Sequence, residues 1–297
     1  MLRTIRLVLL VACGALTGVV FGADRDWSRV GDALGKAGSL QPGGVYRVAL
    51  PRTDLKVAVD GVTLKAGFAL GGWIAFEPMG SEAMMMGDLV LAESEINPVM
   101  SKLLVEGLQV TALHNHLLRA APPIFYMHVA GKGDAEQLAR AVRGALEQSK
   151  TPLGSAATPS AAGADLGIDS AAIDRAIGFK GRNNGGVYQY SLPRSDSVKQ
   201  DGMKMPPAMG VAIGINFQPT GDGRAAVTGD FVALANEVNP LIKALRENGI
   251  EVTAIHNHML DDEPRVFFIH FWANDDAVKL AKGLRAALDA AHVAPKG

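Results

Sequence analysis

The segment Val110-Thr-Ala-Leu-His-Asn-His116 occurs a second time, with one substitution, as Val252-Thr-Ala-Ile-His-Asn-His258. The two copies lie 142 residues apart, at 110 and at 252. Each copy is rich in apolar and β-branched residues, as in a β-strand, on which side chains two residues apart point to the same face. The sequence therefore predicts two equivalent units, each with two histidines side by side on one strand.

The same offset relates many other positions of the two halves. A fixed period of this kind indicates a duplicated structural unit. The matching segments are Gly43-Gly-Val-Tyr46 with 185–188, Leu50-Pro-Arg52 and Asp54 with 192–194 and Asp196, Gly87-Asp88 with Gly229-Asp230, and Glu95 and Asn97-Pro98 with Glu237 and Asn239-Pro240.

The offset falls to 141 in the middle of each unit, where Phe76 aligns with Phe217. A one-residue change in the length of a loop explains this shift. Residues 149–166 are rich in Ala, Ser, Thr, Gly and Pro, a composition typical of a flexible linker. We therefore divide the chain into a signal peptide (1–22), a first repeat domain (23–148), the linker (149–166) and a second repeat domain (167–297).

Within a repeat, the pattern of apolar and turn residues predicts an α+β unit. Several strands come first and are followed by a β-α-β-β-α segment, with the helices packed on an antiparallel sheet. Asn97 is expected to cap a helix and Gly107 to end it. In the first copy we expect helices at 27–37, 97–106 and 134–148, and strands at 45–50 and onward to 76, at 87–92, at 108–116 and at 124–129.

The first residues have the pattern of a secretory signal. Arg3 and Arg6 precede an apolar run that ends near Gly22, after which we expect cleavage. A minor alternative is lipid attachment at Cys13, which the continuing apolar stretch disfavours. We expect a periplasmic or secreted protein, or alternatively a lipoprotein. Cleavage at Gly22 leaves no cysteine, so any bound metal would have nitrogen and oxygen ligands.

Composition limits the partners. The chain has 48% hydrophobic residues and a formal net charge of −1. This balance gives no electrostatic basis for binding nucleic acid or an anionic membrane surface. We expect no transmembrane segment in the mature chain, and we expect a metal ion and a small molecule as partners.

Six of the seven histidines belong to the repeat. A hairpin centred near Pro122 would pair residue 128 with residue 116 and place all three histidines of a copy on one face. Three imidazoles on neighbouring strands can meet an ion at a Zn–N distance of about 2.1 Å. The predicted ligands of a divalent transition metal, zinc first, are His114, His116 and His128 in one site and His256, His258 and His270 in another.

Other repeated polar residues are candidates for supporting roles. Glu95 and Glu237 could complete the metal site or act as general bases, or could instead stabilise the start of a helix. Arg52 and Arg194 could hold an anionic ligand or form turn salt bridges. Asp88 and Asp230 are expected in turns. The methionines at 84–86, 203, 205 and 209 suggest copper, although apolar packing is the preferred interpretation.

These motifs resemble the LppY/LpqO family of bacterial exported proteins and lipoproteins, a domain of unknown function. The resemblance covers nearly all of the mature chain in both copies and implies export without an established activity. The pattern His-x-His with a third histidine on the next strand is also similar to the zinc site of acetolactate decarboxylase and of the related plant and prokaryote conserved domain. In the present chain the gap before His128 is one residue longer than in that pattern.

The leading functional hypothesis is an exported metal-binding protein with two equivalent sites, acting as a metal-dependent lyase or hydrolase. One alternative is a protein that sequesters a metal or small ligand without turnover. Another is a structural envelope protein whose histidines only connect strands.

Overall fold

The computed structural model describes residues 25–154 and 165–294. The signal peptide, Cys13 and the middle of the predicted linker lie outside these ranges. In the described residues no helix is both long and apolar enough to cross a membrane. The first repeat contains, in chain order, α1 (Ser28–Leu34), β1 (Ser39–Leu40), β2 (Tyr46–Pro51), β3 (Ala58–Val59), β4 (Val62–Thr63), α2 (Ala66–Ala69), β5 (Gly71–Met79), β6 (Glu82–Ala92), the 3-10 turn η1 (Glu93–Glu95), α3 (Ile96–Val105), β7 (Gln109–His114), β8 (Ile124–Gly133) and α4 (Ala135–Leu146).

The second repeat follows the same order with small differences in its connecting segments. It contains α5 (Ser170–Ile177), β9 (Arg182–Asn184), β10 (Val187–Pro193), β11 (Lys199–Gln200), β12 (Met203–Lys204), the 3-10 turn η2 (Pro207–Met209), β13 (Ala212–Gly221), β14 (Arg224–Leu234), α6 (Val238–Glu247), β15 (Glu251–His256), β16 (Asp262–Glu263), β17 (Val266–Asp276) and α7 (Ala277–Asp289). The predicted α+β class and the order of elements are confirmed.

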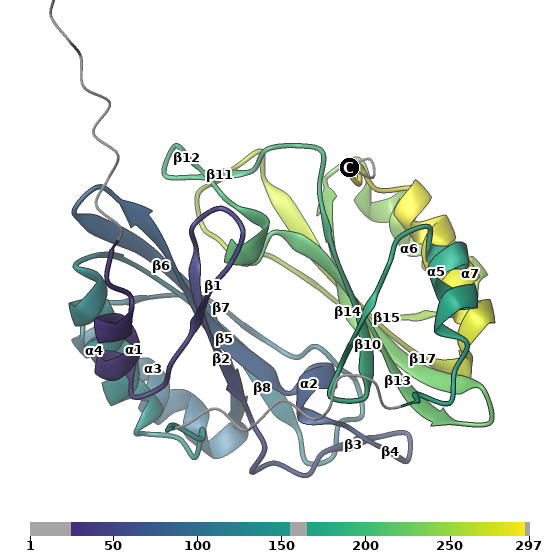
Figure 1. Cartoon of the computed structure of the whole chain (residues 1–297), viewed down its shortest axis with the longest axis horizontal. Helices are drawn as coiled ribbons and strands as arrows, with labels where there is room; N and C mark the ends of the chain where they lie inside the picture. Colours follow the sequence, from purple (N-terminus) through teal and green to yellow (C-terminus); the bar gives the residue numbers. More distant parts are fainter. Residues whose placement is uncertain (1–24, 155–164, 295–297) are drawn as a thin grey trace, which may run out of the picture.

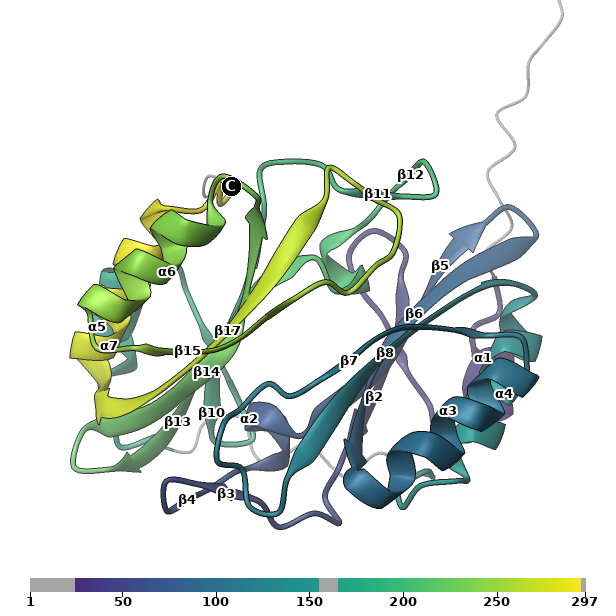
Figure 2. The ribbon, with the colours of Figure 1, turned by 180° about the vertical axis from the view of Figure 1, so that it is seen from behind.

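Each repeat forms one six-stranded antiparallel sheet. The strand orders are β1-β2-β5-β6-β8-β7 and β15-β17-β14-β13-β10-β9. Helices α1, α3 and α4 cover the outer face of the first sheet, and α5, α6 and α7 cover the outer face of the second (Figure 1). The two sheets face each other in the middle of the molecule, as the opposite view also shows (Figure 2).

The repeats are joined by apolar segments that cross from one to the other. The segment with β3, β4 and α2 contributes Phe68 and Leu70 to a buried cluster that includes Trp272 of the second repeat. In return, Met205 and Met209 belong to a core that includes Met86 of the first repeat. Each repeat thus covers apolar surface of the other, and apolar burial favours their association.

Local sequence explains where the helices begin and end. Asp134 caps α4, since its side chain accepts a hydrogen bond from the Gln137 amide at 2.9 Å. Gly107 follows α3 with a φ of 79°, as expected of a glycine after a helix. Asn97, however, lies inside α3, and its expected capping role is wrong. The 3-10 turn η1 starts the helical segment earlier, and the side chain of Glu95 accepts a hydrogen bond from the Ala92 amide.

Candidate metal centre between the repeats

In each sheet, three neighbouring strands place a histidine and an aspartate in one row at directly opposite positions, and these residues belong to the candidate metal centre. Ala112 of β7 lies opposite His128 of β8, and His128 lies opposite Asp88 of β6. His128 therefore pairs with residue 112 and not with residue 116, because the connection between β7 and β8 is a loop and β7 ends at His114. The second sheet repeats the row with Ala254, His270 and Asp230.

The histidines after β7 and β15 are held by the opposite repeat. The Thr253 hydroxyl donates to the backbone carbonyl of His116 at 2.5 Å, and the Thr111 hydroxyl donates to that of His258 at 2.6 Å. His116 also stacks on Tyr126, and His258 stacks on Phe268. These contacts fix both rings where the two sheets meet.

The six imidazoles form one cluster of two stacked layers. Within the first repeat, His114 lies 4.9 Å from His116 and 5.0 Å from His128, measured between ring centroids. Between the repeats the rings lie face to face at shorter distances. The centroid separations are 3.5 Å for His114 and His256, 3.7 Å for His116 and His270, and 3.8 Å for His128 and His258.

Three rings use Nδ1 for a hydrogen bond to a backbone carbonyl, while Nε2 of His114 lies 2.9 Å from Nε2 of His128, within hydrogen-bond distance. His270 Nδ1 lies 2.8 Å from the backbone carbonyl of Gly229, which fixes the proton on Nδ1. His114 and His256 make longer contacts of the same kind, 3.4 and 3.3 Å from the carbonyls of Asn115 and Asn257. A metal-bound histidine commonly donates its other ring N–H in this way.

Several polar atoms of the cluster have no hydrogen-bond partner among the described residues. They are buried, and leaving such groups unpaired costs free energy. A metal ion would satisfy nitrogen and carboxylate donors of this kind, so the residues present fit such an ion. The unpartnered atoms are Nε2 of His116, His256, His258 and His270, and Oδ1 of Asp88 and Asp230.

Burial shifts the protonation of the whole cluster toward neutral groups. It lowers the pKa of His114 to about 4 and that of His256 to about 3, and those of the other four rings well below the usual value. Burial raises the pKa of Asp88 to about 7, opposed by the charge of Arg47. Neutral imidazole is the form that binds metals.

Both repeats contribute to two of the four candidate sets of ligands that contain clustered histidines, and each of the other two sets lies within one repeat. Ligating atoms within 4.8 Å of one another occur in the groups His114/His128/His256/His258, His114/His116/His256/His270, Asp230/His256/His258/His270 and Asp88/His116/His128. The three histidines predicted for the second copy fall in one of these groups with Asp230, whereas the three predicted for the first copy are divided among several groups. The predicted residues do converge, but as one cluster across the interface, because the two sheets face each other.

Asp88 and Asp230 are the members of the cluster that sequence reasoning missed. Their position after glycine suggested turns, whereas both lie inside long strands. Asp88 Oδ1 lies 3.9 Å from His128 Nε2, and Asp230 lies 3.6 Å from His258 Nε2 and 3.8 Å from His270 Nε2. The signal was the Gly-Asp pair repeated at the offset of 142.

Glu95 is engaged in a buried ion pair. Its carboxylate lies 2.7 Å from Arg52 Nη1 and accepts hydrogen bonds from the Ala92 and Lys150 amides. Burial alone would raise the pKa of Glu95, but these donors outweigh it and hold the pKa below its usual value. Among the described residues, no group of ligating atoms with any of the six clustered histidines includes Glu95. The structure therefore gives it a role in connecting β2, η1 and the chain after α4.

Glu237 repeats this arrangement in the second copy. It pairs with Arg194 at 2.8 Å and accepts hydrogen bonds from the amides of Leu234 and His292. Arg52 and Arg194 also pair with Asp54 and Asp196. The two glutamates and the two arginines lie outside the histidine cluster. Both guanidinium groups already pair with carboxylates of the protein. The structure thus keeps Arg52, Arg194 and Glu95 apart from the clustered histidines, and it places Glu237 in a separate group of candidate ligands with Asp196 and His292.

A cavity of about 310 Å³ opens beside the cluster. Asp88, His116, Asp230, His258 and His270 line it, together with residues of both sheets. Its size falls at the lower end of pockets for small molecules. The cluster is therefore accessible from a space that can hold a small ligand.

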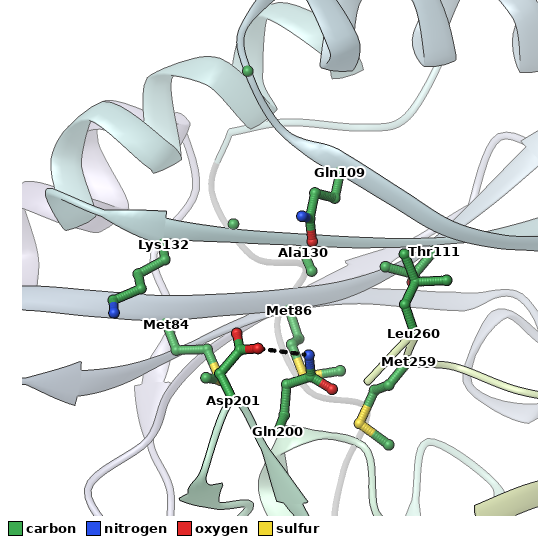
Figure 3. A pocket seen from close by; sticks show the side chains of 12 residues that line it. Met84, Met86, Gln109, Thr111, Ala130, Lys132, Gln200, Asp201, Met259 and Leu260 are labelled. Atoms are coloured by element: carbon green, nitrogen blue, oxygen red, sulfur yellow. Dashed lines mark hydrogen bonds between the residues drawn. The ribbon is translucent and has the colours of Figure 1, made fainter. Parts of the chain in front are cut away.

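A second cavity, of about 270 Å³, lies between β6, β7 and β8 of the first repeat and the segments after β11 and β15 of the second. Met84, Met86 and Met259 lie around it, with Lys132 and Asp201 (Figure 3). The three methionines are at most 5% exposed and belong to the apolar core shared by the repeats. For Met84 and Met86 this packing supports the apolar interpretation over copper binding.

Fold and site together define a duplicated α+β protein with a histidine and carboxylate cluster between two facing sheets. The family model of the Domain of Unknown Function (DUF1259) matches the chain twice, at residues 28–148 and 171–290. The chain belongs to this family and contains two tandem copies of its domain. No curated protein matches the chain.

Two solved structures match most of the length of the chain at low sequence identity. One is described as "Crystal structure of a trimeric bacterial microcompartment shell protein PduB", with 11% identity over 86% of this chain and 89% of that chain and a TM-score of 0.21. The other is "Crystal structure of EtuB from Clostridium kluyveri", with 10% identity over 84% of this chain and 90% of that chain and a TM-score of 0.22.

Proposed function

We propose that the six histidines, with Asp88 and Asp230, form one transition-metal centre shared by the two repeats, with zinc as the first candidate, and that the protein is a metal-dependent lyase or hydrolase for a small molecule. The observation that carries the proposal is that the cluster has buried, unpartnered Nε2 and Oδ1 atoms and that its ligating atoms form groups of three or four within 4.8 Å of one another. Three or four nitrogen and oxygen donors suit zinc and related ions.

The cavity favours catalysis over sequestration. A protein that only stores an ion encloses it in a complete set of ligands, whereas a catalytic ion keeps a position for water or substrate. Here Asp88, His116 and His258 lie on the wall of the cavity. An ion held by these residues would supply Lewis-acid chemistry, which would activate a substrate oxygen or a water molecule. A carboxyl group of Asp88 or Asp230 that does not bind the ion is then placed to accept or donate a proton, whereas Glu95 and Glu237 are apart from the cluster.

Elemental analysis tests the shared centre. We expect chelator-treated protein to regain zinc, and we expect His114→Ala and His256→Ala each to lose more than half of it, because each ring contacts ligands of both repeats. Arg143→Gln, on the outer helix α4 and outside every group of candidate ligands among the described residues, is the control and should bind as much zinc as the unaltered chain. Wild-type protein that takes up no zinc would end the metal proposal. If each single variant instead lost half of its zinc, and the double variant His114→Ala/His256→Ala lost all of it, the result would indicate two independent sites.

A cobalt-loaded sample distinguishes an open from a closed centre. We expect azide to change the visible absorption spectrum, because the cavity gives an added ligand access to the ion. An unchanged spectrum would support the sequestering protein in place of the enzyme.

We further propose that the chain is exported and that its family corresponds to the LppY/LpqO proteins. The arginines and apolar run before Gly22 support export. N-terminal sequencing of the protein from its native host would show cleavage after Gly22, or a blocked lipid-modified start at Cys13.

A further inference from the structure

Arg47 lies on the wall of the cavity, where it forms no direct ion pair, although the carboxyl group of Asp88 on the same wall interacts with its charge at longer range. None of the ion pairs within residues 25–154 and 165–294 involves Arg47. Its guanidinium group lies 3.9 Å from the centroid of the Trp73 ring, and Nη1 donates to the Ala208 carbonyl. Because guanidinium has five N–H donors, this one hydrogen bond leaves donors for a ligand.

The stacking prepares Arg47 for binding. A guanidinium group held flat on an aromatic ring loses less freedom when it forms two parallel hydrogen bonds. Burial lowers the pKa of Arg47 to about 10, so the group remains charged at neutral pH. An anion that enters the cavity therefore meets a fixed, charged and planar donor.

The two repeats differ at this position although their histidines and aspartates are the same. The residue that corresponds to Arg47 is Gln189, whose amide group donates to Gly67 and Asn216 of the cavity walls. Opposite Asp230 in the second sheet lies Gly214, in the place that Trp73 takes opposite Asp88. Since a side chain at Gly214 would meet nothing within 4 Å, the glycine leaves open space. The cavity thus has one cationic wall and one neutral, open wall.

We propose that this cavity binds a small anion whose carboxylate or phosphate group pairs with Arg47, with the rest of the molecule directed toward the histidine cluster. The inference rests on the proposed metal centre for the orientation of the ligand, but the anion site itself consists of Arg47 and Trp73. Arg–carboxylate and Arg–phosphate pairs are commonly bidentate, and a cavity of this size holds one small molecule.

Calorimetric titration with two probes, benzoate and phenyl phosphate, tests the anion site. Protein treated with chelator and protein loaded with zinc are both titrated, at constant ionic strength. We expect at least one probe to bind both forms of the protein. The variant Arg47→Gln, which has the side chain found at the equivalent position of the second repeat, should bind that probe with at least tenfold lower affinity. Tighter binding of benzoate would assign a carboxylate ligand, and tighter binding of phenyl phosphate a phosphate ligand.

Three further variants separate binding from folding. Arg47→Lys keeps the charge without the planar donor and should bind more weakly than the unaltered protein. Trp73→Leu keeps Arg47 but removes the stacking, and should also bind more weakly. Arg119→Gln changes an arginine that pairs with Asp60 and Glu251 outside the cavity and should bind normally.

The outcomes distinguish this inference from the metal proposal. Unchanged affinity in Arg47→Gln with an unaltered melting temperature, or no binding of either probe by the unaltered protein, would overturn the anion site. Normal anion binding by a protein that takes up no zinc would overturn the metal centre alone. Arg47→Gln should keep the zinc content of the unaltered protein, because Arg47 is not a ligand.

Discussion

Glu77 shows how one carboxyl group outside the centre can limit stability. Its Oε2 atom is buried and has no hydrogen-bond partner among the described residues. Burial raises the pKa of Glu77 from 4.5 to about 6. A folded-state pKa above the unfolded value means that the folded protein favours the protonated form, so ionisation destabilises it as the pH rises.

We expect Glu77→Gln to stabilise the chelator-treated protein by about 1 kcal/mol at pH 7.5, where the carboxyl group is ionised, and to have no effect at pH 4, where it is protonated in both states. Denaturant unfolding at both pH values measures the difference. Glu82→Gln on the same hairpin, at an exposed position, is the control. A gain of the same size at pH 4 would show that the charge of Glu77 is not the cause.

At the scale of the strand, the centre depends on close contacts that only glycine permits. A Cβ atom at Gly229 would lie 2.0 Å from the Gly214 carbonyl oxygen and 3.0 Å from the Phe271 ring. The first contact is with backbone of the neighbouring strand, which cannot move aside as a flexible side chain can. The Gly229 carbonyl also accepts the hydrogen bond of His270.

We therefore expect Gly229→Ala to cost about 3 kcal/mol through overpacking and to reduce zinc binding as well. Thermal unfolding and elemental analysis measure the two effects. Gly214→Ala is the matched control on the adjacent strand, since an added Cβ there meets nothing within 4 Å. Equal stability of the two variants would contradict the argument.

Sequence patterns at this scale predicted the elements better than their pairing. The helix of α4 could be predicted because Asp134 and the apolar spacing of Leu138, Val142 and Leu146 act locally. The pairing of His128 could not, because the length of the loop before β8 sets the register. The repeated histidines identified the ligands, but the partner of each ring depends on how two sheets meet. A local sequence pattern also cannot predict ion pairs such as that of Glu95 with Arg52, because the two residues are 43 positions apart in the chain.

At the scale of the whole molecule, the repeats share their interior. Trp272 belongs to a cluster made mainly by the first repeat, and Met86 to one made mainly by the second. The Gln218 side chain also accepts a hydrogen bond from the Lys65 amide and donates one to the Thr63 carbonyl. These contacts couple the unfolding of one repeat to that of the other.

Zinc should therefore stabilise the molecule as a unit. We expect zinc at about 100 times its dissociation constant to add about 2.7 kcal/mol to the stability of chelator-treated protein, a rise of about 5 °C or more in melting temperature. The physical reason is that the ion binds only where both repeats are folded, since His114 and His256 lie face to face at 3.5 Å. Calorimetry should show one transition with and without zinc, and the rise should vanish in the double variant His114→Ala/His256→Ala. Two transitions of which zinc moves only one would mean that a single repeat holds the metal by itself.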